Sequence, residues 1–305
     1  MSKRVAAIDC GTNSIRLLIC DIDDGKKTDV LRMQRIVRLG QDVDRTSRLA
    51  PEALERTFAA TREYADIISK HDVEVVRFCA TSAARDAENS AEFVDGIVSI
   101  LDTKPEVLTG ADEAYATYIG AARDLDNPQE PVLVVDLGGG STELVLGKGN
   151  DVLVAQSLDI GCVRMSERHL FSDPPTEVEI ANARRDIAAA LDSTFVDVMQ
   201  AKTVVGVAGS MTTIAAHVLG LSSYDPERIH HSRLPKLAVL DTCNLFAHSS
   251  MDDLRKFGFM HPQRVDVIGA GALVVLEIMN RVKVDTLTVS EKDILDGIAW
   301  GAVAH

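Results

Sequence analysis

Short apolar runs alternate with longer amphipathic stretches along this chain of 305 residues. The short runs end at glycine or polar residues, which is typical of buried strands. The longer stretches repeat apolar residues every three or four positions, which is typical of helices packed on a sheet. Strands are predicted at 5–9, 15–21, 28–35, 73–79, 106–109, 152–158, 203–208 and 284–290. Helices are predicted at 51–70, 90–101, 109–123, 162–171, 176–200, 211–219, 235–248, 264–281 and 294–303. This alternation predicts an α/β fold.

Residues 132–146 read VLVVDLGGGSTELVL and predict two strands joined by a tight glycine turn. The backbone N–H groups of such a turn converge on one space and bind anions, phosphate above all. The candidate phosphate ligands in this turn are Gly139, Gly140, Ser141 and Thr142.

A second copy of this pattern, IDCGTNSIRLLI, occupies residues 8–19. Aligning Asp9 with Asp136 places Gly11 on Gly138 and Ser14 on Ser141. The copies lie about one domain length apart, so the chain is predicted to hold two related domains. We place them at residues 1–125 and 126–305 and leave open that the last helix packs back on the first domain. The two hairpins are expected to face each other across a cleft, with Asn13 and Ser14 as further phosphate ligands.

Carboxylates flank both glycine turns. Asp136 and Glu143 lie on either side of the second turn, and Asp9 precedes the first. A phosphate site surrounded by carboxylates favours a divalent cation between them. We predict Mg²⁺, with Mn²⁺ as an alternative, held by Asp9, Asp136 and Glu143.

Three other segments could contact an anionic substrate. Gly209 and Ser210 lie between a predicted strand and a predicted helix, which makes a third anion site. Arg85 follows a strand in a turn of small residues, where it could either clamp a phosphate or form a surface salt bridge. The last of these segments, residues 32–48, is interpreted either as a basic rim that guides a polyanion or as a solvated loop that balances nearby acids. Its arginines are Arg32, Arg35, Arg38, Arg45 and Arg48.

The paired hairpins resemble the actin, hexokinase and acetate-kinase superfamily, which has two ribonuclease-H-like domains. Within it, DCGTNS and DLGGGSTEL are most similar to the Ppx/GppA phosphatases, and the resemblance runs from residue 5 to about 301. It implies that Arg85, in ATSAAR, clamps phosphate, and that Glu113 is the general base with Asp112 as helper or spectator. It also implies a homodimer. Leu295 stands where the family usually has arginine, so that phosphate contact is not expected here.

Composition limits the binding partners, the cysteine chemistry and the cellular location that are expected. The formal net charge is −14, which argues against general affinity for nucleic acid or anionic membranes. The five cysteines are scattered without a CxxC pair, so neither disulfides nor a zinc site is expected. No signal peptide or membrane-spanning stretch is recognised, which favours a cytoplasmic protein. His230 and His231 are adjacent, and we expect their side chains to diverge.

The sequence therefore predicts a metal-dependent exopolyphosphatase that removes the terminal phosphate of inorganic polyphosphate. Short chains are the expected substrate, because the C-terminal helical domains of long family members are not found here. Hydrolysis of guanosine pentaphosphate is an alternative with the same chemistry. A sugar-kinase-like phosphotransferase and a non-catalytic sensor of polyphosphate or alarmone are alternatives of other classes.

Overall fold

A computed structural model describes residues 2–123 and 125–303. The chain divides into two compact units, Met1–Gly120 with Ile294–His305, and Ala121–Asp293. The dividing point after Gly120 falls inside a helix, a few residues before the predicted boundary at 125/126. The last helix groups with the first unit, the arrangement that the sequence left open.

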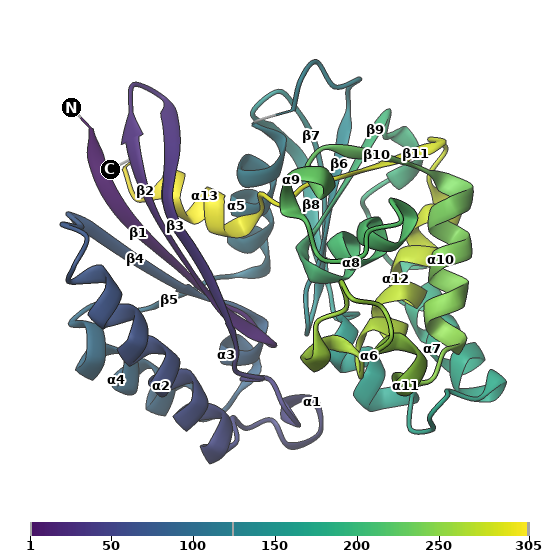
Figure 1. Cartoon of the computed structure of the whole chain (residues 1–305), viewed down its shortest axis with the longest axis horizontal. Coiled ribbons are helices and arrows are strands. Elements are labelled where there is room, and N and C mark those ends of the chain that lie inside the picture. The colour runs from purple at the N-terminus through teal and green to yellow at the C-terminus, as the bar shows by residue number, and fades with distance from the viewer. Residues whose placement is uncertain (1, 124, 304–305) are drawn as a thin grey trace. The chain divides into compact units, whose positions relative to one another are not determined.

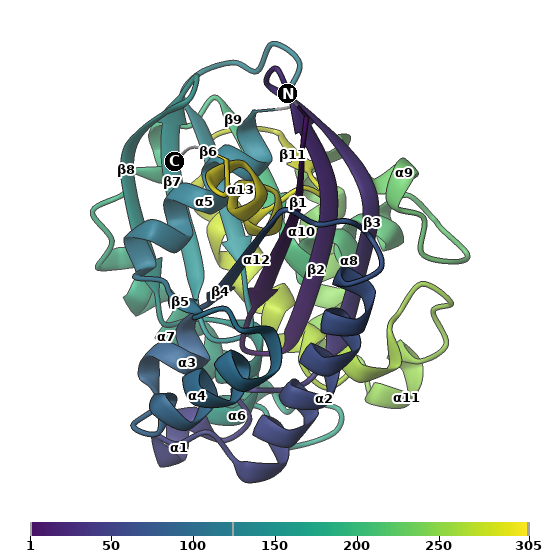
Figure 2. The ribbon, with the colours of Figure 1, turned by 90° about the vertical axis from the view of Figure 1, so that its left-hand side faces the viewer.

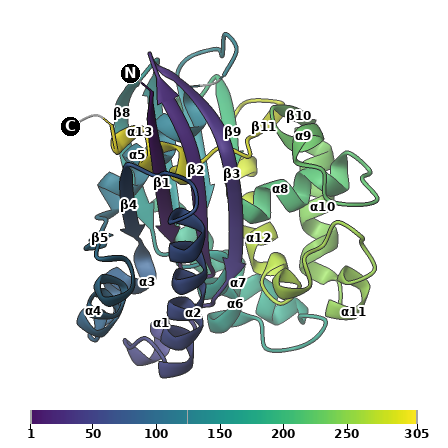
Figure 3. The same cartoon turned by 60° about the vertical axis from the view of Figure 1, so that its left-hand side comes forward.

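The first unit is built on a five-stranded sheet in the order β3-β2-β1-β4-β5. Strands β1, β2 and β3 form an antiparallel meander that Figure 3 shows side by side, and β4 and β5 continue the sheet in parallel with β1. The strands are β1 (Lys3–Cys10), β2 (Ser14–Asp23), β3 (Lys26–Ile36), β4 (Val75–Ala80) and β5 (Glu106–Val107).

The second unit repeats this arrangement in a six-stranded sheet, β10-β11-β9-β6-β7-β8. Here β6, β7 and β8 form the antiparallel meander, and β9 runs parallel to β6 as β4 does to β1. The strands are β6 (Val132–Leu137), β7 (Thr142–Lys148), β8 (Asp151–Leu158), β9 (Thr203–Val207), β10 (Ser232–Pro235) and β11 (Thr286–Val289).

The two hairpin turns also close in the same way. The N–H of Gly11 donates to the carbonyl of Ser14 at 2.9 Å, and the N–H of Gly138 donates to that of Ser141 at 3.0 Å. The repeat that the sequence predicted is therefore confirmed in the strand order and in the turn hydrogen bonds.

Helices cover both faces of the first sheet, as Figures 1 and 2 show. Helices α2 and α4 pack on one face around Tyr64, Phe78 and Phe93, while α13 packs on the other against β1 and β2. Apolar residues on alternate positions of β1 supply both cores, because successive strand side chains point to opposite faces. The helices are α1 (Val43–Thr46), α2 (Pro51–Ile68), α3 (Ser82–Asp86), α4 (Ser90–Leu101), α5 (Gly110–Ala122) and α13 (Ile294–Gly301).

The second sheet carries a larger core, with α12 at its centre. Eleven of the fourteen residues of α12 are buried, and it packs against α6, α7 and α10. The helices are α6 (Cys162–His169), α7 (Glu177–Asp192), α8 (Ala208–Val218), α9 (Pro226–Ile229), α10 (Lys236–His248), α11 (Met251–Leu254) and α12 (Ile268–Arg281), with 3₁₀ turns at Val198–Gln200 and Pro262–Arg264. Within the described residues, no helix has the length and apolar character needed to cross a membrane.

Two predicted helices are shorter than expected. Helix α7 ends at Asp192 rather than near residue 200, because Gln156 of β8 accepts hydrogen bonds from the Phe195 N–H at 3.0 Å and the Thr194 hydroxyl at 2.8 Å. Its predicted start is confirmed, since Thr176 and Glu179 form a capping box. Helix α12 begins at Ile268 rather than at residue 264, after the 3₁₀ turn.

The expected loop at 224–233 was wrong in part, because it contains α9 and the start of β10. The expectation that His230 and His231 diverge was also wrong. Their ring centroids lie 3.8 Å apart. The left-handed backbone of His231, with φ of 60°, turns its side chain back toward its neighbour.

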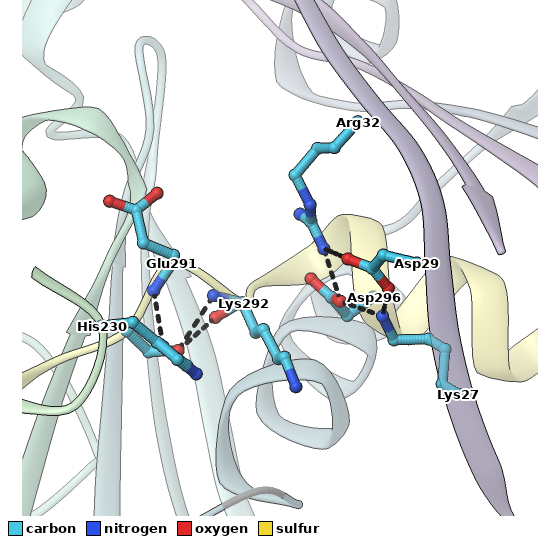
Figure 4. Close-up of polar contacts among 8 residues, drawn as sticks. Lys27, Asp29, Arg32, His230, Glu291, Lys292 and Asp296 are labelled. Atoms are coloured by element: carbon cyan, nitrogen blue, oxygen red, sulfur yellow. Dashed lines mark hydrogen bonds and ion pairs between the residues drawn. The ribbon is translucent and has the colours of Figure 1, made fainter. Parts of the chain in front are cut away.

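A buried carboxylate fixes α13 to the first sheet. Asp296 is fully buried and lies 2.7 Å from the Arg32 guanidinium and 2.9 Å from the Lys27 ammonium, as Figure 4 shows. Burial raises the pKa of Asp296, but the charges of Arg32 and Lys27 outweigh it and hold the pKa below its ordinary value. Leu295, also fully buried, packs in the apolar core beside this cluster.

We expect Asp296→Asn to lower the free energy of unfolding by about 3–5 kcal/mol, because it removes the fully buried counter-charge of the Lys27 ammonium and leaves only the more exposed Asp29 beside it. The more exposed Asp29, which contacts the same two cations, is the matched control, and Asp29→Asn should cost less than about 1 kcal/mol. Because folding lowers the pKa of Asp296, its stabilisation is present above pH 4 and is lost as the pH falls through the lowered pKa. Urea unfolding of both variants from pH 3 to 7 checks this. Equal losses in the two variants would contradict it.

Candidate functional site

The glycine turn of the second hairpin rests on the N-terminus of α6. The carbonyls of Gly138 and Gly139 accept hydrogen bonds from the N–H groups of Cys162, Val163 and Arg164 at 2.9–3.1 Å, and the Gly140 carbonyl accepts from the N–H of Gly161 at 3.3 Å. The Arg164 side chain adds a bond from Nε to the Gly140 carbonyl at 2.7 Å. The first turn of α6 therefore holds the carbonyl side of the glycine turn in one conformation.

Close packing behind this turn requires a glycine at position 161, which the sequence did not single out. A Cβ on Gly161 would lie 2.2 Å from the carbonyl oxygen of Gly139, so a side chain cannot be placed there without moving the turn. Ser141 and Thr142 are buried, and the Thr142 hydroxyl donates to the carbonyl of Ile160 at 2.7 Å. The Thr142 side chain is therefore used to hold the turn.

Strand register places the two carboxylates of the second hairpin side by side. Asp136 and Glu143 are directly opposite each other in the β6–β7 pair, so their side chains lie on the same face of the sheet. They are 6% and 1% exposed. The Ser157 hydroxyl on the neighbouring strand donates to Glu143 at 2.7 Å. Two adjacent buried carboxylates favour a cation beside them.

In the first hairpin, the position that corresponds to Glu143 carries a positive charge, that of Arg16. Asp9 is opposite Arg16 in the β1–β2 pair, and the guanidinium contacts the Asp9 carboxylate at 2.5 and 2.9 Å. Arg16 therefore supplies the positive charge that Asp9 needs. This ion pair does not test the predicted metal role of Asp9, but it occupies one carboxylate oxygen.

The loop of the first hairpin is held by neighbouring segments of its own unit. The carbonyl of Asn13 accepts from the N–H groups of Val37 and Arg38 at 3.0 and 2.9 Å. Thr12 shares a hydrogen bond of 2.8 Å with the Ser82 hydroxyl. As in the second hairpin, the carbonyl side of the turn is fixed by the protein. Asn13 and Ser14 are partly exposed.

The structure brings Arg85 and Glu113 together. Arg85 lies in α3 and Glu113 in the first turn of α5, and Nη1 of the arginine is 3.0 Å from Oε2 of the glutamate. The same Nη1 donates to the carbonyl of Leu108 at 3.1 Å. No hydrogen bond joins Nη2 of Arg85 to any described residue, so this nitrogen is available to a ligand. The Glu113 side chain is only 8% exposed.

Asp112, the neighbour of Glu113, caps the helix. The Thr109 hydroxyl donates to the Asp112 carboxylate at 2.7 Å and accepts from the Asp112 N–H at 3.2 Å. This reciprocal pair gives the Asp112 N–H, in the first turn of α5, a hydrogen-bond acceptor. The two adjacent acids therefore have different surroundings: Asp112 pairs with Thr109, whereas Glu113 pairs with Arg85.

The third predicted anion site starts helix α8. Gly209 and Ser210 lie in its first turn, next to its first residue, Ala208, which has a left-handed backbone with φ of 70°. Ser210 is buried, and a Cβ on Gly271 would lie 2.5 Å from its hydroxyl, so the side chain faces α12. Its hydroxyl is therefore turned into the helix packing, and any contact of Ser210 with an anion would be through its backbone N–H.

Arg264 also lies at this helix start, although it was not among the predicted site residues. A Cβ on Gly209 would come within 1.7 Å of the Arg264 Nη1, so the guanidinium lies directly against the glycine. In the sequence, Arg264 and Asp266 form an Arg-x-Asp pattern just before α12. Its meaning became visible only when the fold placed residue 264 beside residue 209.

Most of the arginines proposed as a basic rim pair with acids. Arg32 contacts Asp29 and Asp296, and the other ion pairs lie at the surface. These pairs are Arg35 with Glu63, Arg45 with Asp42, and Arg48 with Glu88 and Glu92. These four arginines therefore balance nearby acids, but Arg32 and Arg35 lie on β3 and Arg45 in α1, so they do not form one loop. Arg38 has a left-handed backbone beside the first hairpin.

The carboxylates of the second hairpin fit a divalent cation. Asp136 and Glu143 provide hard oxygen ligands, as Mg²⁺ prefers. Among the residues that the structure describes, no three His, Cys, Asp or Glu side chains gather into a group that could hold a metal.

Comparison with known proteins identifies the fold. An exopolyphosphatase-like protein of known structure is 42% identical and superimposes with a TM-score of 0.94, covering 98% of this chain and 97% of that one. The Ppx/GppA enzyme of Aquifex aeolicus is 34% identical, with a TM-score of 0.83 over 98% and 99% of the two chains. The chain therefore has the α/β fold of the Ppx/GppA enzymes, built from two units that repeat one sheet arrangement, and the predicted α/β class is confirmed.

Sequence comparison gives the family. The model of the Ppx/GppA phosphatase family matches residues 18–304. A protein of Mycobacterium tuberculosis named Exopolyphosphatase 2 is 47% identical over 97% of both chains. The chain belongs to the Ppx/GppA phosphatase family. Enzymes of this family generally depend on a divalent metal ion.

We expect Gly161→Ala to displace the glycine turn and to lower the free energy of unfolding by about 1–3 kcal/mol, because its Cβ overlaps the Gly139 carbonyl. Gly269→Ala is the matched control, since its nearest neighbour would lie at an ordinary 3.4 Å. Thermal and urea unfolding compare the two variants. A Gly161→Ala protein as stable as Gly269→Ala would show that the packing behind the turn is looser than described.

Proposed function

We propose that this protein is an exopolyphosphatase, which hydrolyses the terminal phosphoanhydride bond of inorganic polyphosphate. The observation that carries the choice of substrate is the 47% identity with Exopolyphosphatase 2 over 97% of both chains. The hydrolytic chemistry is supported by Arg85 and Glu113, which the resemblance and the structure bring to one place.

Glu113 is the proposed general base. Its buried carboxylate would orient a water molecule and accept its proton as the water oxygen attacks the terminal phosphorus. The bond between that phosphorus and the bridging oxygen breaks, and the bridging oxygen leaves with the electron pair on the shortened chain. The ion pair with Arg85 holds the carboxylate in one orientation, which such a role requires.

Arg85 is the proposed clamp on the terminal phosphoryl group. Nη1 holds Glu113 and the Leu108 carbonyl, which leaves Nη2 for a phosphate oxygen. One guanidinium would thus position both the base and the reacting group. Phosphoryl transfer depends mainly on such positioning and on stabilisation of charge.

The glycine turns are the proposed cradle for the rest of the chain. Because the carbonyls of residues 138–140 point to α6, the backbone N–H groups of Gly139, Gly140 and Ser141 are proposed as anion ligands. Asn13 and Ser14 would act similarly in the first hairpin. Gly209, Ser210 and Arg264 at the start of α8 are proposed to bind a more distant phosphate.

A divalent cation is proposed beside Asp136 and Glu143, with Asp9 as a further ligand. When bound, such a cation neutralises phosphate charge and makes the phosphorus easier to attack. Mg²⁺ is the proposed ion and Mn²⁺ the alternative. Asp136 and Glu143 of the second hairpin carry the support for this proposal, because Asp9 in the first hairpin already pairs with Arg16.

Guanosine pentaphosphate hydrolysis is the second candidate. A protein of Aeromonas salmonicida named guanosine-5'-triphosphate,3'-diphosphate pyrophosphatase is 28% identical over 100% of this chain and 60% of its own length. The proposed base, clamp and cradle would serve either substrate. A non-catalytic sensor is disfavoured by the Arg85–Glu113 pair.

The proposal predicts phosphate release from polyphosphate in the presence of Mg²⁺. Short polyphosphate, long polyphosphate and guanosine pentaphosphate are compared in parallel by measuring kcat/KM. We expect the higher value with polyphosphate. Release from the nucleotide alone would assign the protein to the second candidate, and binding of all three without release would make it a sensor.

Replacement of the proposed base gives a sharper test. Glu113→Gln should lower kcat by about 10²–10⁴-fold, because the amide cannot accept the proton. The KM or binding constant for polyphosphate should stay within a few-fold of that of the unmodified protein. Asp112→Asn, one residue away, is the control and should retain most activity. A near-normal kcat in Glu113→Gln would remove Glu113 from this role.

A further inference from the structure

The second unit has a pocket that the proposed chemistry does not use. It has a volume of about 590 Å³, within the usual range for small-molecule sites. One wall comes from β9, β10 and β11, and another from the segment 125–129. Arg233 and Thr288 are opposite each other in the β10–β11 pair, so they present their side chains on one face of the sheet.

The pocket lies away from the glycine turn. Thr203, which lines it, is opposite Val132 at the start of β6, whereas the turn follows Asp136 near the end of that strand. Four residues of strand separate these positions, about 13 Å. A ligand in the pocket would therefore be distinct from a phosphate held by the turn.

Three cations converge on this pocket without acidic partners. Lys202, Arg233 and Lys283 line it, and none of them forms an ion pair with any residue that the structure describes. All three are exposed. In a chain with a net charge of −14, three such cations around one pocket make a local site for an anion.

Two carboxylates in the same pocket restrict what the anion can be. Asp126 and Asp285 line it beside the three cations. An inorganic polyphosphate chain carries negative charge along its whole length, so these carboxylates would repel it. An organic phosphate suits the mixture, because the cations can bind its phosphate while the carboxylates accept hydrogen bonds from sugar hydroxyls.

The remaining walls suit a nucleobase. Pro128, Met199 and Val284 offer apolar surface, and the imidazole of His231 lies beside that of His230, with the ring centroids 3.8 Å apart. A base is flat and largely apolar on its faces, so it can pack against such surfaces. The pocket thus offers partners for a phosphate, a ribose and a base.

We infer that this pocket of the second unit binds a nucleotide, with the phosphate on Lys202, Arg233 and Lys283 and the ribose hydroxyls on Asp126 and Asp285. This ligand differs from the substrate of the proposed function. The inference stands on the pocket alone and does not depend on hydrolytic activity.

Calorimetric titration with AMP and GMP tests the inference, because these probes have no phosphoanhydride bond for the proposed reaction to consume. The double variant Lys202→Glu/Lys283→Glu should bind the favoured nucleotide at least tenfold more weakly than the unmodified protein. The same nucleotide without its ribose hydroxyls should also bind more weakly, and replacing both Asp126 and Asp285 with alanine should remove that difference. Lys148→Glu, at an exposed position of the same unit, is the matched control and should bind normally.

Steady-state hydrolysis of polyphosphate by the same variants separates the two proposals. The double variant should keep kcat and KM within twofold, since its lysines lie outside the proposed catalytic machinery. A tenfold rise in KM for polyphosphate would make the pocket part of the polyphosphate path and would overturn the inference. So would the absence of AMP and GMP binding at millimolar concentration, or equal binding by the double variant. If no phosphate is released by any protein, the proposed function fails while the nucleotide titration still decides the inference.

Discussion

The register of the two hairpins is the constraint on which the candidate site depends. In each hairpin a strand ends at an aspartate, turns through glycine and returns so that a charged residue lies opposite that aspartate. The glycine turn gives the backbone freedom to present N–H groups, and the helix or loop behind it fixes the carbonyls. A shift of one residue would send these charged side chains to the other face of the sheet.

The two copies keep the same backbone but differ in charge at one position. In the first hairpin Asp9 faces Arg16, so the pair is balanced within the protein. In the second, Asp136 faces Glu143, and both are buried. This difference makes the second hairpin the better place for a cation, while the first can hold its loop without one.

Helix α5 has an unusual position in this arrangement. Its first turn carries Glu113 in contact with Arg85, and the division between the two compact units falls near its end. The segment after it forms a wall of the pocket inferred to bind a nucleotide. The proposed base and the pocket are therefore joined by one short stretch of chain. Near the C-terminus, the ion pairs of Asp296 with Lys27 and Arg32 hold α13 on the first sheet.

The sequence by itself determined the α/β class, most strands and helices, and the repeated hairpins, because these depend on local periodicity and on glycine at fixed positions. It also singled out Arg85, and through resemblance Glu113, but it did not predict their contact across 28 positions. Tertiary structure alone decided which side chains meet. It pairs Arg16 with Asp9, places Arg264 against Gly209 and turns the Ser210 hydroxyl toward α12. It also decided where α7 ends, since the Gln156 side chain comes from a distant strand. Such contacts depend on how elements far apart in the chain pack together, which no local pattern records.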